Sequence, residues 1–141
     1  MILVTGLTES QIVRSVLRTT RQTYLPAALL GAVVGQYLGA LGYKRDSQPF
    51  LWSAVAAAWA LPGIGLASSL LTRSLAGSLT LTLLASWGLP LFLFPIAKAL
   101  VEDGMSMRGY DVLVSGWLLY MGEIGRQMAI SLIAGRRYAA V

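Results

Sequence analysis

Four polar side chains are expected on one face of the last apolar segment of the chain, residues 112–134. Glu123 and Arg126 stand three residues apart and Gln127 follows Glu123 by four, so these three side chains meet if the segment is helical. Tyr120 falls on the same face, one turn earlier. Because a charged side chain at the centre of a membrane helix costs about 2.5 to 3.5 kcal/mol, we expect protein or trapped water around this face. The sequence therefore predicts a buried polar site.

Three interpretations of this predicted site remain open. The first, which we favour, is a structural lock, in which the Glu123–Arg126 pair neutralises itself and fixes helix rotation or the choice of partner. The second is a carboxylate that carries a proton or a cation. The third is a ligand site, in which Glu123 coordinates a pigment magnesium or a lipid headgroup. The sequence leaves the cofactor unknown.

The composition excludes most enzyme chemistry. The chain has no cysteine and no histidine, which excludes thiolate nucleophiles, histidine acid–base catalysis and histidine-ligated haem or zinc. Glu123 is the one acid expected at membrane depth, so a pair of catalytic carboxylates is not expected there. We therefore expect no catalytic residue, no metal site and no enzymatic activity.

The distribution of apolar residues predicts an all-α membrane protein with one domain spanning residues 1–141. Of its residues 56% are hydrophobic and only 12% are charged, and the apolar residues form long runs separated by short polar connections. Such runs predict a bundle of four transmembrane helices, with the boundaries 25–41, 50–71, 75–97 and 112–134. Kinks are expected at Pro62–Gly63 and at Gly88–Pro90, and solvated loops at 42–49 and 98–111.

Residues 8–23 are expected to form an amphipathic helix on the membrane surface before the first crossing. Thr8 and Gln11 have the spacing of a capping box, which marks the helix start. Arg14, Arg18 and Arg21 recur on one helix face, opposite an apolar stripe, and are candidates for contact with lipid headgroups. The alternative is a solvated helix whose arginines only set the topology.

Three glycines at four-residue spacing, Gly31, Gly35 and Gly39, lie in the first predicted crossing. They would form a ridge almost without side chains, which another helix can approach closely. The spacing does not specify whether that helix belongs to the same chain, to a second copy or to another protein.

The charge distribution sets the expected location and partners. The net charge is +5, but the basic residues flank apolar segments, so we expect contact with membrane lipids and not with nucleic acid. With four crossings, six Lys and Arg residues lie on the side of the termini and four on the other. This bias places both termini in the cytoplasm, and the expected location is a bacterial cytoplasmic or comparable energy-transducing membrane. The first ten residues lack the basic region of a secretory signal.

Together these features favour a non-enzymatic integral membrane subunit that packs into a larger homo- or hetero-oligomeric membrane complex. The alternative function is a small oligomeric carrier or channel coupled to protons or cations, in which Glu123 binds the transported ion.

Overall fold

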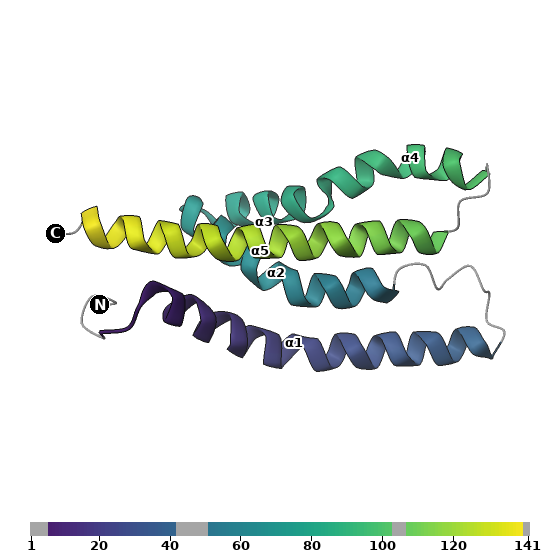
Figure 1. Cartoon of the computed structure of the whole chain (residues 1–141), viewed down its shortest axis with the longest axis horizontal. Coiled ribbons are helices and arrows are strands. Elements are labelled where there is room, and N and C mark those ends of the chain that lie inside the picture. The colour runs from purple at the N-terminus through teal and green to yellow at the C-terminus, as the bar shows by residue number, and fades with distance from the viewer. Residues whose placement is uncertain (1–5, 42–50, 103–106, 140–141) are drawn as a thin grey trace.

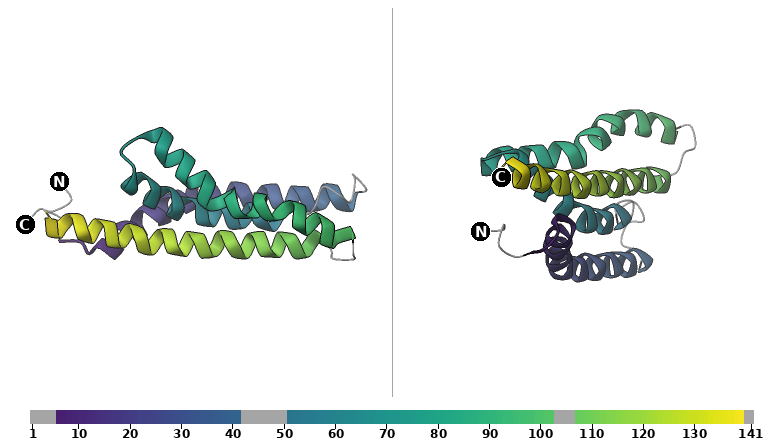
Figure 2. Two further views of the ribbon diagram at one scale, coloured as in Figure 1. Left: turned by 90° about the horizontal axis from the view of Figure 1, so that it is seen from above. Right: turned by 60° about the vertical axis from the view of Figure 1, so that its left-hand side comes forward.

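The protein is an all-helical bundle in a computed structural model that describes residues 6–41, 51–102 and 107–139 (Figure 1). The elements are α1 (Glu9–Ala40), α2 (Leu51–Leu71), α3 (Leu75–Leu83), the π-helical turn η3 (Leu84–Gly88), α4 (Leu89–Glu102) and α5 (Met107–Ala139). Helix α2 lies between α1 and α5, α3 packs against α2, and α4 packs against α5 (Figures 1 and 2). The turn η3 contacts both α2 and α5. The start of α1 and the end of α5 lie at the same end of the bundle.

The predicted surface helix 8–23 and the first predicted crossing 25–41 are one continuous helix, α1. Pro26, at the predicted boundary between the two segments, lies inside this helix. The predicted capping box is present, because Thr8 N–H donates to Oε1 of Gln11 at 2.9 Å. The apolar stripe of this segment packs against protein, since Val13 and Leu17 are buried with Ala129 of α5. The expectation that this segment lies on a membrane surface by its apolar stripe is therefore wrong for these two side chains.

The closest helix contact joins α2 and α5 through glycine backbones. A Cβ atom on Gly125 would lie 2.7 Å from the carbonyl oxygen of Gly63, and one on Gly122 would lie 2.8 Å from Cα of Ala60. These distances are too short for any side chain, so glycine is required for this approach. Helix α2 is helical throughout Leu51–Leu71 with Pro62 inside it, and Gly63, where a kink is predicted, also forms a packing contact with α5.

Helix α5 also binds both ends of α2. At the start of α2, the buried carboxylate of Asp111 accepts a hydrogen bond from Ser53 N–H at 3.1 Å. At its end, Arg136 donates to the carbonyl oxygen of Leu70 at 2.5 Å. An acid at the N-terminus and a base at the C-terminus both complement the helix dipole. Asp111 was expected in a solvated loop, but α4 and α5 extend into residues 98–111 and place it inside the bundle.

The α-helix of the predicted third crossing is interrupted just before Pro90. Pro90 has no N–H to donate to Ser86, and the chain forms the π-helical turn Leu84–Gly88 just before it. Two side chains of α5 bind the carbonyl groups of this region: Trp117 donates to Ala85 at 3.2 Å, and the Tyr110 hydroxyl donates to Pro90 at 2.5 Å. The helix continues past Pro95 within α4.

Two of the described segments are long and apolar enough to cross a membrane, Trp52–Leu71 and Leu75–Ile96. The second is largely exposed in the chain, with Leu75 and Phe92 at 78% and 75%. The helical bundle is thus confirmed, and the two segments weakly indicate a membrane. The finer prediction of four crossings is not confirmed. The predicted loop at 42–49 lies outside the described residues.

The close glycine contact between α2 and α5 predicts different outcomes for two matched substitutions in α5. Gly125→Ala should lower the free energy of unfolding by about 1 to 3 kcal/mol, because its new methyl group overlaps the Gly63 backbone. Gly116→Ala should leave stability unchanged or slightly raised, because its Cβ would meet no atom within 4 Å. Thermal unfolding of both variants in the same detergent measures the difference, and equal stabilities would contradict the proposed contact.

Candidate functional site: a basic cleft between three helices

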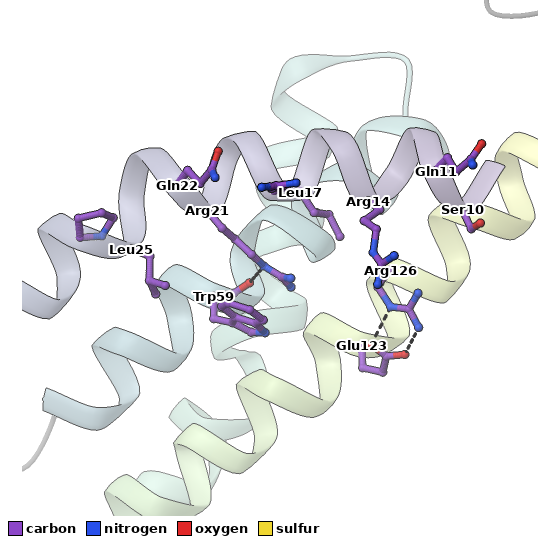
Figure 3. A pocket seen from close by; sticks show the side chains of 12 residues that line it. Ser10, Gln11, Arg14, Leu17, Arg21, Gln22, Leu25, Trp59, Glu123 and Arg126 are labelled. Atoms are coloured by element: carbon purple, nitrogen blue, oxygen red, sulfur yellow. Dashed lines mark hydrogen bonds and ion pairs between the residues drawn. The ribbon is translucent and has the colours of Figure 1, made fainter. Parts of the chain in front are cut away.

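A cleft of about 1070 Å³ lies between α1, α2 and α5. It brings together two groups that the sequence placed in separate features: the arginines of the 8–23 segment and the Glu123–Arg126 pair (Figure 3). Its lining consists of Ser10, Gln11, Arg14, Leu17, Arg18, Arg21, Gln22, Leu25, Pro26, Trp59, Glu123 and Arg126. The wall from α1 is thus strongly basic.

Packing on either side positions the charged walls. Val13 and Leu17 dock α1 against α5, which leaves Arg14, Arg18 and Arg21 on the neighbouring face of the same helix. On α5, Gly122 and Gly125 face α2. Glu123 and Arg126 are each one residue further along, so they are rotated by about 100° toward α1.

Arg21 is the α1 arginine that is fixed to another helix. Its Nε donates to the carbonyl oxygen of Trp59 at 3.0 Å, and its guanidinium carbon lies 3.8 Å from the centre of a Trp59 ring. The contact combines a charge-assisted hydrogen bond with a cation–π interaction. It holds the floor of the cleft to the basic wall, as Figure 3 shows.

The predicted pairing of Glu123 is confirmed. Arg126 donates to both carboxylate oxygens, at 2.8 Å through Nε and at 2.5 Å through the terminal nitrogen, and Gln127 donates at 3.0 Å. This bidentate geometry is the strong form of an arginine–carboxylate pair. Both oxygens of Glu123 are occupied by partners on its own helix.

The predicted burial of this pair is wrong for the chain by itself. The side chains of Arg126 and Glu123 are 40% and 49% exposed, and Tyr120 is 63% exposed. Leu118, on another face of α5, is fully buried. The close glycine contact between α2 and α5 turns Leu118 and its neighbours toward α2. The polar sector of α5, which consists of Tyr120, Glu123, Arg126 and Gln127, consequently faces the cleft and the outside.

The remaining candidates lie apart from the cleft. Tyr120 packs beside Trp117, with ring centres 6.5 Å apart, and does not line the cleft. Gly31 has open space where a Cβ would be, so the predicted ridge makes no close helix contact there. Gly35 lies in α1, and the surroundings of Gly39 lie outside the described residues. The glycines used inside the chain, Gly63, Gly122 and Gly125, were not identified as a packing set from the sequence.

The cleft carries an excess of positive charge. Four arginines face one glutamate, and Arg14 and Arg18 have no acidic partner among the residues that the structure describes. The uncompensated arginines make the cleft suited to an anion and unsuited to a cation.

Two lysine substitutions separate the fixed arginine from a free one. Arg21→Lys should lower stability by about 1 kcal/mol, because an ammonium loses the planar stacking on Trp59 and the directed Nε–H. Arg18→Lys keeps the charge and loses no described bond, so little change is expected. Hydrogen exchange across α1 is the measurement, and faster exchange in Arg18→Lys than in Arg21→Lys would contradict this assignment.

Comparisons with known proteins provide no precedent for the cleft. No protein-family model, no curated protein and no solved structure matches the chain. Its function therefore has to be argued from the charge, exposure and contacts of its own residues.

Proposed function

We propose that the chain is a non-enzymatic integral membrane subunit that packs into a larger membrane complex through the polar sector of α5. The observation that supports this proposal is the exposure of Tyr120, Glu123 and Gln127 on a helix otherwise flanked by apolar surface. Glu123 and Gln127 bond to each other and to Arg126, but their remaining hydrogen-bonding capacity and the Tyr120 hydroxyl would face lipid tails, which offer no hydrogen bonds. A second protein chain, of the same or another kind, would supply them.

The apolar surface of the bundle supports the membrane part of the proposal. Large apolar side chains are exposed along the second half of α1 and along α3 and α4, among them Leu30, Val33, Leu83 and Leu91. A soluble monomer rarely exposes continuous apolar surface of this extent. Lipid would cover these faces, whereas the polar sector of α5 would be left to protein.

The proposal can be tested with a photo-crosslinking residue at two exposed positions. Position 120 in the polar sector should give covalent adducts with a protein chain in native membranes, and position 83 in α3 should not. The native side chains have nearly equal exposure, 63% for Tyr120 and 60% for Leu83, so position 83 is a matched control. Mass spectrometry of the adducts identifies the partner, and equal adduct yields at the two positions would contradict the proposed interface.

The alternative function, an ion carrier that uses Glu123, gives a different result in liposomes. For a subunit, the purified chain should move neither protons nor cations, and Glu123→Gln should leave assembly largely intact. For a carrier, the chain should give a measurable flux that Glu123→Gln abolishes. The positive charge of the cleft favours the first outcome, because it repels cations from Glu123.

A further inference from the structure

We infer that the cleft between α1, α2 and α5 binds a phosphate group, and that this phosphate belongs to the headgroup of an anionic phospholipid. The inference deepens the proposed function, because it identifies the lipid class that this membrane subunit holds. It differs from surface contact by the α1 arginines alone, since α5 and α2 form the other walls of the cleft.

The arrangement of charges selects an anion. Glu123 lines the cleft, but both of its oxygens are engaged by Arg126, and Gln127 adds a third bond. Its charge is therefore compensated within α5. Arg14, Arg18 and Arg21 remain as three positive charges on the opposite wall.

The number of donors selects phosphate over a single carboxylate. A carboxylate offers two oxygens and is satisfied by one guanidinium fork. A phosphate offers more acceptor oxygens and is matched by guanidinium groups that approach from several sides. Arg14 and Arg18 stand one helical turn apart on α1, and they have no acidic partner among the described residues.

The remaining lining selects a lipid as the source of the phosphate. Leu17, Leu25, Pro26 and Trp59 form an apolar part of the same cleft. Beyond Leu25 and Pro26, α1 continues with the exposed apolar residues Leu29 and Leu30. A headgroup at Arg14 and Arg18 would thus have an apolar path for its acyl chain along α1, which a free phosphate would not use.

The experiment compares lipid retention in two charge-matched double variants. Purified protein is placed in phosphatidylcholine nanodiscs with or without phosphatidylglycerol, and bound lipid is measured by native mass spectrometry. Arg14→Gln/Arg18→Gln should weaken retention of phosphatidylglycerol about 30-fold, at roughly fivefold for each basic side chain. Arg73→Gln/Lys98→Gln removes the same charge from exposed positions outside the cleft and should change it little. Circular dichroism checks that both variants keep their helices.

The outcomes separate this inference from its alternatives. Equal retention of the two lipids, or equal losses in the two double variants, would overturn it. Calorimetry with inorganic phosphate in detergent forms a second arm: binding as tight as that of the lipid, with the same dependence on Arg14 and Arg18, would assign the site to a soluble phosphate and overturn the lipid source. A photo-adduct between the cleft and an acidic peptide of another chain would likewise overturn it.

Failure of the proposed function has a different signature. If the chain resists extraction from membranes by alkaline carbonate but does not discriminate between lipids, the membrane subunit stands and the cleft inference fails. If carbonate extracts the chain while inorganic phosphate still binds through Arg14 and Arg18, the phosphate site stands and the membrane proposal fails.

Discussion

The contact between the backbones of α2 and α5 fixes the rest of the structure. Gly63, Gly122 and Gly125 bring the two helices so close that no side chain fits between them. Such an approach leaves α5 little freedom to rotate, because any rotation would drive a side chain into the α2 backbone. Asp111 and Arg136 then bind the two ends of α2 and fix its position along α5. The pair is held in both rotation and register.

The cleft follows from that fixed rotation. With Gly122 and Gly125 against α2, Glu123 and Arg126 face α1. Helix α1 docks beside them through Val13 and Leu17, and Arg21 bonds to Trp59. The charged residues belong to three helices, yet their meeting depends on small and apolar residues that carry no chemistry themselves.

The sequence predicted local features well and their spatial relations poorly. The residue spacing was sufficient to predict the helices, the capping box at Thr8 and the bonds of Glu123 with Arg126 and Gln127. All of these depend on neighbours three or four residues apart. The convergence of Arg14 and Arg126 depends on which side of α5 meets α2, and spacing alone does not decide this. Polarity suggested that Glu123 points inward, but the glycines beside it decided the rotation. The sequence did contain a signal for the close contact between α2 and α5: the small residues Gly122, Gly125 and Ala129 follow one another at spacings of three and four.

The depth of the cleft explains why its arginines need water or an anion beside them. Arg21 bonds at Trp59, 12 residues before the end of α2, which corresponds to about 18 Å along the helix. If α2 crosses a bilayer, Arg21 lies near its middle, where an uncompensated arginine costs about 2.5 to 3.5 kcal/mol. That cost is a large share of the stability of a typical domain, about 5 to 15 kcal/mol. Arg18 and Arg14 lie about 5 and 10 Å nearer the start of α1, because each residue of the helix adds about 1.5 Å. The basic wall therefore runs from the depth of Arg21 toward the headgroup level at Arg14, and water or an anion that enters from that end would lower the cost of the buried charge.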